Sequence, residues 1–249
     1  MNTPEQMLDA ATHALEDIDV SLPERFRDDD WHDWFARLRK EDPVHYCRDS
    51  INGAYWSVTK HADIKAVDTN HEIFSSEAGG VAIVDPREED KGVENFIAMD
   101  PPRHDEQRRT VTPSVAPANL ATMEPLIRER VIDILDNLPV GETFNWVDKV
   151  SVELTARMLA TLFDFPYEDR RKLVYWSDIT TNVPQVTGIE IDMEERRVGL
   201  QECAITFYQL WQERAAAEPK FDLISMLAHG ESTKDLISDP MKLLGNIIL

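Results

Sequence analysis

The sequence predicts a mainly α-helical fold with a small antiparallel β-sheet. Long stretches carry apolar residues at helical spacing, and only residues 44–48 and 54–59 have the composition and spacing of strands. The Asn52-Gly53 pair between these two segments is a signal for a hairpin turn. Glycine, proline and charged residues break every periodic pattern from Ser75 to Ala98, which predicts a long loop of the kind that is usually functional.

The N-terminal region is predicted to hold three short helices. Thr3-Pro4-Glu5-Gln6 is a capping box with proline at the first helical position, and it predicts a helix as far as about Asp17. An amphipathic helix is expected over residues 31–40, and a shorter helix over His61–Asp68.

The apolar stripes of residues 120–138 and 146–163 are expected to form core, within a C-terminal half predicted to consist of four longer helices and one shorter helix. Their expected positions are residues 120–138, 146–163, 166–181, 193–218 and 221–228, with a loop at 182–192. No composition shift marks a linker between these helices, so we expect a single domain over residues 1–249.

Composition excludes several classes of protein. The chain has 249 residues and a net charge of −21, which argues against binding to nucleic acid. Two isolated cysteines suit a reducing compartment, and no His or Cys spacing is typical of a metal site. A signal peptide and a membrane-spanning stretch are both lacking. We therefore expect a cytoplasmic protein without a membrane anchor, a metal site or nucleic-acid binding.

The most informative motif is the run from Met99 to Val111. A helix is expected to begin at Pro101 or Pro102, with Asp100 as its N-cap, because the fixed φ of proline suits the first helical turn. The side chains of His104 and Arg108, four residues apart, then share one helical face. An imidazole and a guanidinium in this arrangement can clamp carboxylates or a phosphate. On the residues alone, a solvated charged face remains the alternative.

This run resembles the start of the C helix in bacterial cytochromes P-450, the haem-thiolate monooxygenases. Three earlier segments resemble the same family: Trp34–Val44 its first helix, Tyr55–Ile64 its second strand and B helix, and Phe74-Ser75-Ser76 the entry to its B–C loop. The resemblance implies that His104 and Arg108 hold the haem propionates. It implies the N-terminal portion of the cytochrome P-450 fold, truncated at the start of the central, I-like helix.

The iron ligand of that family is not found in this chain. Members of the family bind the haem iron through a cysteine in a glycine-rich loop near their C-terminus. Cys47 lies in a predicted strand and Cys203 in a predicted helix, and neither has such a loop around it. The nearly all-apolar run Lys242–Leu249 has no cap, which we interpret as an interrupted helix. We therefore expect a partial chain that is inactive alone and holds no catalytic residue.

The resemblance implies haem-dependent monooxygenation of an apolar small molecule, with electrons drawn from NAD(P)H through a ferredoxin and a ferredoxin reductase. The Ser75–Pro113 block and the Val183–Ile191 loop look most like the branch that hydroxylates terminal carbons of medium-chain alkanes and fatty acids. The alternative is a catalytically inactive helical protein that binds a partner or an apolar ligand.

Two further sets of residues follow from the resemblance. Arg103 and Arg109 are candidates for the face that docks the redox partner, since local potential rather than net charge steers encounter. Apolar residues of the loops and of the last helix are candidates for the substrate pocket, with plain core as the alternative for each. These are Val81, Ile83, Val84, Phe96, Ile97, Val183, Val186, Ile189, Leu244 and Ile247.

Overall fold

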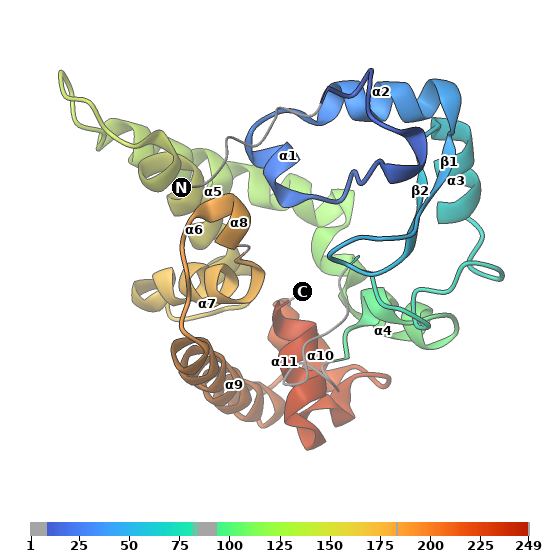
Figure 1. Ribbon diagram of the computed structural model, residues 1–249. Helices are drawn as coiled ribbons and strands as arrows, with labels where there is room; N and C mark the ends of the chain where they lie inside the picture. The colour runs from blue at the N-terminus through green and yellow to red at the C-terminus, as the bar shows by residue number, and fades with distance from the viewer. Residues whose placement is uncertain (1–8, 82, 84–93, 183, 249) are drawn as a thin grey trace. The chain divides into compact units, whose positions relative to one another are not determined.

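The computed structural model describes residues 9–81, 83, 94–182 and 184–248 (Figure 1). The chain divides into two compact units. The first comprises Met1–Lys91, Ile97–Asp100 and Val183–Glu190, and the second comprises Gly92–Phe96, Pro101–Asn182 and Ile191–Leu249. Helices dominate the described residues, beside a sheet of two strands, which confirms the predicted fold class. A single domain over residues 1–249 stays a prediction.

The sheet of the first unit is the predicted hairpin. Strand β1 (Val44–Cys47) pairs antiparallel with β2 (Tyr55–Val58), and Val44 faces Val58 across the register. Gly53 in the connecting turn has a φ of +79°, a conformation that side chains with a Cβ rarely adopt. The alternating burial of β1 turns His45 and Cys47 inward.

Four helices belong to the first unit: α1 (Pro23–Arg27), α2 (Trp31–Glu41), α3 (His61–Asp68) and the short α8 (Pro184–Thr187), which lies within the predicted loop 182–192. Trp34 and Leu38 of α2 are fully buried, because the apolar stripe of α2 faces a small cluster with Ile18 and Val20. The guanidinium of Arg25 lies 3.6 Å above the Trp34 ring, a cation–π contact that holds α1 against α2.

The prediction of an N-terminal helix is wrong for the residues of that segment that the structure describes. Residues 9–17 contain turns and one 3₁₀ segment, Leu15–Asp17, whereas the capping box itself lies outside the described residues. The reason is a competing partner from α2. Arg37 Nη1 donates to the carbonyls of Ala10 and His13, each at 2.6 Å, and so takes acceptors that a helix would use.

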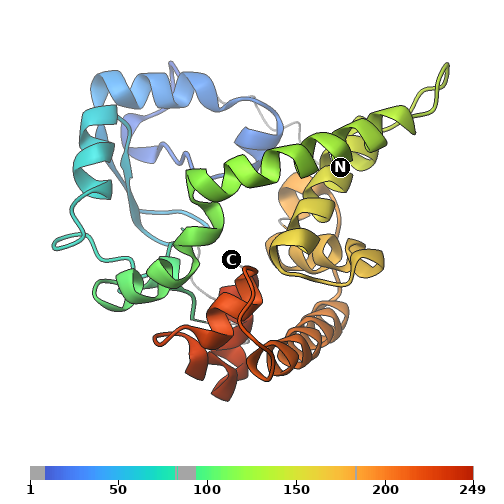
Figure 2. The same ribbon diagram turned by 180° about the vertical axis from the view of Figure 1, so that it is seen from behind.

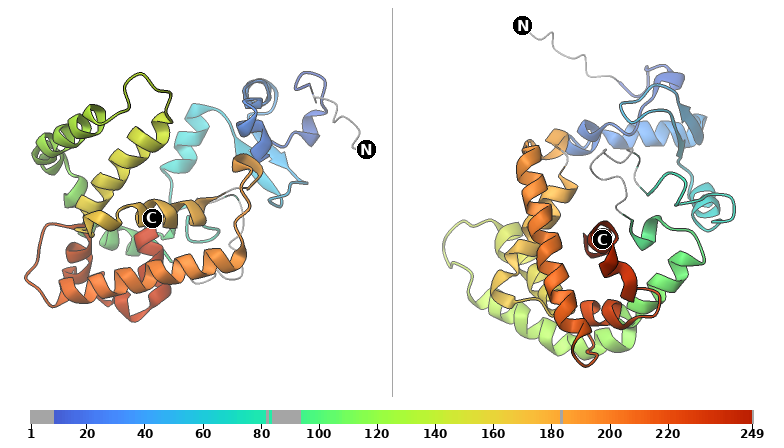
Figure 3. Two further views of the ribbon diagram at one scale, coloured as in Figure 1. Left: turned by 90° about the vertical axis from the view of Figure 1, so that its left-hand side faces the viewer. Right: turned by 90° about the horizontal axis from the view of Figure 1, so that it is seen from below.

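The second unit contains the longer helices, as predicted. They are α4 (Arg103–Val111), α5 (Pro117–Asp136), a π-helical segment Val147–Val152 that continues into α6 (Glu153–Leu162), α7 (Arg171–Thr181), α9 (Met193–Ala215), α10 (Leu223–His229) and α11 (Pro240–Ile248). Figure 2 shows α5 and α6 as an antiparallel pair, and Figure 3 shows α10 and α11 beside the long α9. Among the described helices, none has both the length and the apolar character needed to cross a bilayer.

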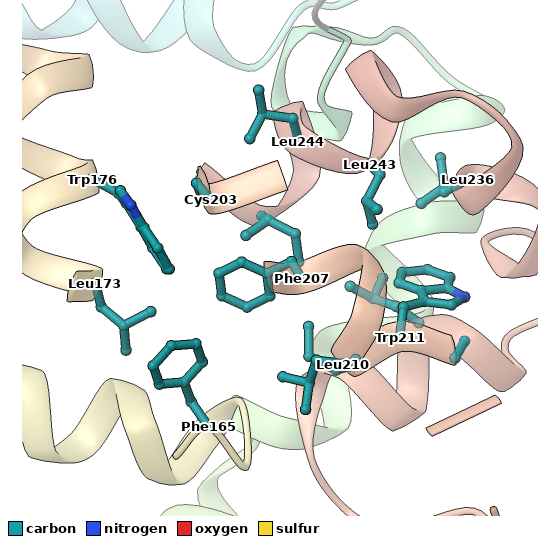
Figure 4. Packing of buried hydrophobic residues seen from close by; sticks show 14 of the residues in the cluster. Phe165, Leu173, Trp176, Cys203, Phe207, Leu210, Trp211, Leu236, Leu243 and Leu244 are labelled. Atoms are coloured by element: carbon teal, nitrogen blue, oxygen red, sulfur yellow. The ribbon is translucent and has the colours of Figure 1, made fainter. Parts of the chain in front are cut away.

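One apolar core holds this second unit together (Figure 4). Its centre is Phe207 of α9, whose ring centroid lies 5.9 Å from that of Trp176 and 5.7 Å from that of Phe165. Leu243, Leu244 and Ile247 of α11 pack into the same core. As far as Ile248, where the described residues end, this apolar run is therefore helical and largely buried.

Candidate functional site

Helix α4 begins at Arg103, within two residues of the predicted start. The predicted cap is wrong: Pro102 occupies the N-cap position, and no side chain caps the helix. The carboxylate of Asp100 instead accepts a hydrogen bond from Ser75 Oγ at 2.5 Å and from the main-chain N–H of Ser76 at 3.0 Å. The Ser75 hydroxyl is the main cause that lowers the pKa of Asp100. Asp100 is therefore committed to the preceding loop.

His104 lies in the first turn of α4, and the main chain fixes its ring. Its Nδ1 lies 3.0 Å from the carbonyl oxygen of Phe96. Because a carbonyl can only accept a hydrogen bond, Nδ1 must carry the proton. The Phe96 ring packs edge-on at a centroid distance of 6.2 Å. The other ring nitrogen, Nε2, has no hydrogen-bond partner among the residues that the structure describes.

Arg108 lies one helical turn beyond His104, on the same face of α4, as the spacing predicted. Its side chain is exposed, and its guanidinium forms no hydrogen bond or ion pair with any described residue. His104 Nε2 and the Arg108 guanidinium, neither of which has a partner among the described residues, therefore lie about one turn apart, in the first and the last turn of α4 respectively. The positive end of the helix dipole favours an anion beside His104, in the first turn, but this effect does not extend to Arg108 in the last turn.

The two other arginines of α4 differ in their surroundings. Arg103 Nη2 pairs with Glu94 at 2.7 Å, so its charge is partly neutralised. Arg109 has no ion pair with a described residue and lines an open groove of about 500 Å³ together with Glu106 and Glu231. A second groove, of about 540 Å³, includes Arg103. Neither groove is lined by His104 or Arg108.

The pocket candidates separate into exposed and buried groups. In the first unit the described candidates are all exposed: Val81, Ile83, Ile97, Val186 and Ile189. In the second unit Leu244 and Ile247 are each 7% exposed and belong to the apolar core, whereas Phe96 lies against His104. Val84 and Val183 lie outside the described residues. Within the second unit, the structure thus brings Phe96 together with His104.

Asn246 is a polar contact that the sequence interpretation missed. It lies in α11, is 9% exposed, and accepts a hydrogen bond at Oδ1 from the N–H of Phe96 at 3.3 Å. Its Nδ2 donates to the carbonyls of Glu94 at 3.5 Å and Lys242 at 3.0 Å. The available signal was an amide side chain in the middle of an apolar helical run, where asparagine is a poor helix former.

Both cysteines are buried. Cys47 is 3% exposed and Cys203 is 2% exposed. Burial raises the pKa of the Cys203 thiol to about 12, and it also raises the pKa of Cys47. Within the described ranges, no group of three or more His, Cys, Asp or Glu side chains is arranged to hold a metal ion.

The chain matches no family model. It is 30% identical over 230 residues to linalool 8-monooxygenase of Pseudomonas putida, a match that covers 87% of this chain and 55% of that protein. It is 27% identical over 216 residues to a steroid C26-monooxygenase of Mycolicibacterium smegmatis, covering 82% of this chain and 49% of that protein. The chain spans about half the length of these curated relatives.

Solved structures agree with the sequence relatives. The fold matches CYP153D17 from a Sphingomonas species with a TM-score of 0.80 and 42% identity, covering 92% of this chain and 57% of that one. It matches a type 153 cytochrome P-450 from Novosphingobium aromaticivorans with a TM-score of 0.80 and 39% identity, covering 93% and 57%. This chain therefore belongs to the cytochrome P-450 family, and it spans about half the length of the members that it matches.

Proposed function

We propose that this chain is the part of a haem-dependent monooxygenase that holds the haem propionates, through His104 and Arg108. One observation carries the proposal. The imidazole of His104 and the guanidinium of Arg108 lie one helical turn apart on α4, and His104 Nε2 and the Arg108 guanidinium have no partner among the described residues. Haem, the cofactor of the family to which the chain belongs, carries propionate carboxylates that can bind these two groups.

The donor set fits a haem propionate. A guanidinium presents N–H groups in a planar fork that matches a carboxylate. Because the Phe96 carbonyl keeps the proton on Nδ1, Nε2 of His104 can donate to a carboxylate only when the ring carries both protons. In that form both ring nitrogens are donors, one for the Phe96 carbonyl and one for a propionate. When bound, haem supplies the oxidative chemistry, while these residues orient it and neutralise its carboxylates.

We propose an apolar substrate, in particular the terminal carbons of medium-chain alkanes or fatty acids. The resemblance of the loops to that branch supports this choice, as do the 39% and 42% identities to the two type 153 proteins. Val81, Ile83, Ile97, Val186 and Ile189 remain proposed substrate-facing residues of the first unit, and Phe96, beside His104, remains one of the second unit. Leu244 and Ile247 are weaker candidates, because their side chains already pack in the core.

We propose that electrons come from NAD(P)H through a ferredoxin and its reductase. Of the two arginines predicted for the docking face, Arg109 is the better candidate. Its charge is free of ion pairs with described residues, whereas Arg103 is paired with Glu94. An ion pair lowers the local positive potential that steers an acidic partner.

The haem assignment is tested in the full-length protein with Arg108→Leu and His104→Leu. The measurement is the rate of haem transfer to apomyoglobin at fixed pH. Each variant is expected to lose haem roughly 10- to 100-fold faster, since each removes a hydrogen bond to a charged group. Arg128→Leu, at an exposed cation of α5, is the matched control and should be unchanged. Unchanged rates in both variants would contradict the assignment.

The substrate class is tested separately in the same holoprotein. Medium-chain alkanes and fatty acids are expected to change the haem Soret band on binding and to be hydroxylated at a terminal carbon. A full-length protein that takes up no haem but still binds an apolar ligand or a partner would support the alternative of an inactive binding protein.

A further inference from the structure

Residues Glu94–Phe96 form a short strap, and two helices of the second unit hold it. From α11, Asn246 Oδ1 accepts from the Phe96 N–H, and Lys242 Nζ lies 3.6 Å from the Glu94 carboxylate. From α4, Arg103 pairs with the Glu94 carboxylate, and His104 Nδ1 donates to the Phe96 carbonyl. The strap therefore carries hydrogen bonds from α11 on one side and from α4 on the other.

The two contacts to Phe96 use the two ends of one residue. Its N–H donates to Asn246 Oδ1 at 3.3 Å, and its C=O accepts from His104 Nδ1 at 3.0 Å. These two groups belong to adjacent peptide units joined at the Cα of Phe96, so a shift of the main chain at Phe96 moves the acceptor that orients the imidazole. The orientation of the His104 ring thus depends on two successive hydrogen bonds, the first of which begins at Asn246 on α11.

Neither packing nor helix formation explains an asparagine at position 246. It is 9% exposed, between Gly245 and Ile247, in a helix whose neighbouring residues are apolar and buried. A leucine would fill the same volume and would favour the helix more strongly. What an amide adds is one acceptor for the Phe96 N–H and donors for the carbonyls of Glu94 and Lys242.

We propose that Asn246 is a positioning residue, which sets the orientation of the His104 imidazole through the main chain of Phe96. The inference rests on the proposed function, since it concerns the side chain assigned to a haem propionate. It assigns to α11 a role at the propionate end of the haem site, exerted through the strap. The Glu94 ion pairs with Arg103 and Lys242 add a charge contact that holds the strap in place.

The test uses the full-length holoprotein with Asn246→Leu, His104→Leu and the double variant. Asn246→Leu should speed haem transfer to apomyoglobin about fivefold, the size expected for one neutral hydrogen bond. In the His104→Leu background the same substitution should change the rate by less than about twofold, because the residue through which it acts is gone. Equal effects in both backgrounds would show a merely structural role and would overturn the proposal.

Two further variants sharpen the result. Asn246→Gln keeps an amide, with an acceptor for the Phe96 N–H and donors for the two carbonyls, and should retain haem within about twofold of the wild type, so haem loss as fast as in Asn246→Leu would contradict the proposal. Met241→Leu alters the same helix at a residue that contributes none of the strap's hydrogen bonds or ion pairs, and it is the matched control. If Asn246→Leu fails to fold, Asn246→Ala replaces it, with the same expectation.

A spectroscopic readout separates positioning from stability. The resonance Raman bending mode of the haem propionates should shift in Asn246→Leu in the same direction as in His104→Leu, and should not shift in Met241→Leu. Arg108→Leu distinguishes a failure of the proposed haem-binding function from a failure of the role inferred for Asn246. If neither Arg108→Leu nor His104→Leu alters haem loss, the proposed function fails. If both do and Asn246→Leu is additive with His104→Leu, only this inference fails.

Discussion

The carboxylate of Glu153 accepts two hydrogen bonds from Arg170, from Nε at 3.0 Å and from Nη2 at 2.8 Å. Arg157 Nε adds a third at 2.7 Å and Arg171 Nε a fourth at 3.1 Å. Glu153 begins α6 and is 9% exposed, and it ties α6 to the start of α7. A buried charge that is satisfied in this way becomes costly when one partner is removed.

Glu153→Gln should lower the free energy of unfolding by about 2–4 kcal/mol, because it leaves three guanidinium groups without their shared anion. Urea unfolding at neutral pH measures the change. Glu124→Gln is the control, since Glu124 pairs with Arg128 on the exposed side of α5 and should cost less than about 1 kcal/mol. Equal losses in the two variants would argue against a structural role for the buried cluster.

The same carboxylate predicts a dependence of stability on pH. Burial raises the pKa of Glu153, but the hydrogen bonds from Arg157 and Arg170 outweigh it and hold the pKa below the usual 4.5. A lowered pKa in the folded state contributes stability above pH 4.5, which is lost as the pH falls through the folded value. The stability difference between the wild type and Glu153→Gln should therefore shrink on acidification below pH 4.5. A constant difference would contradict this interpretation.

Gly230 should not tolerate a side chain. A Cβ there would lie 2.5 Å from Thr233 Oγ1, 2.6 Å from Thr110 Cγ2 and 3.0 Å from the Met226 carbonyl. Thr233 has little room to move, because it is 1% exposed and donates to the Leu227 carbonyl at 2.7 Å. Gly230→Ala is expected to cost about 1–3 kcal/mol in thermal or urea unfolding.

Gly79→Ala is the matched control for that substitution. A Cβ at Gly79 meets no atom within 4 Å, and its φ lies outside the left-handed region. This variant should stay within about 0.5 kcal/mol of the wild type. Equal stability of the two alanine variants would mean that the residues around Gly230, at the C-terminal end of α10, can move to make room for a methyl group.

Neither cysteine thiol should react in the native protein. Cys203 has its pKa raised to about 12 by burial, and the neighbouring charge of Glu202 acts in the same direction. The pKa of Cys47 is also raised by burial. Iodoacetamide labelling at pH 8, followed peptide by peptide with mass spectrometry, should be roughly a hundredfold slower than in urea-unfolded protein, because the thiolate is the reactive form. Rapid native labelling would contradict this.

Local sequence patterns predicted the helices and the hairpin well. The apolar spacing that indicated residues 120–138 and 146–163 corresponds to α5, Pro117–Asp136, and to the π-helical segment Val147–Val152 with α6, Glu153–Leu162. These elements follow from side chains a few residues apart, which a single sequence displays directly. For the same reason, it was predictable that His104 and Arg108 lie one turn apart on the same face of a helix.

Contacts between distant segments could not be predicted in this way. Asp100 has the composition of an N-cap, yet Ser75 and Ser76 take its carboxylate. Arg37 takes the carbonyls of Ala10 and His13 from the expected first helix. The hydrogen bond from Phe96 to Asn246 joins residues about 150 positions apart, beyond any local pattern.

The hairpin of β1 and β2 turns an apolar face toward solvent. Val44, Tyr46 and Trp56 are 45%, 43% and 63% exposed, and the Tyr46 and Trp56 rings lie 4.8 Å apart across the strands. In the described chain the sheet has two strands, so each strand presents one row of main-chain groups without a neighbour. Such a ribbon accepts a further strand by edge pairing. Left uncovered, it is the segment where intermolecular β-association of this chain would begin.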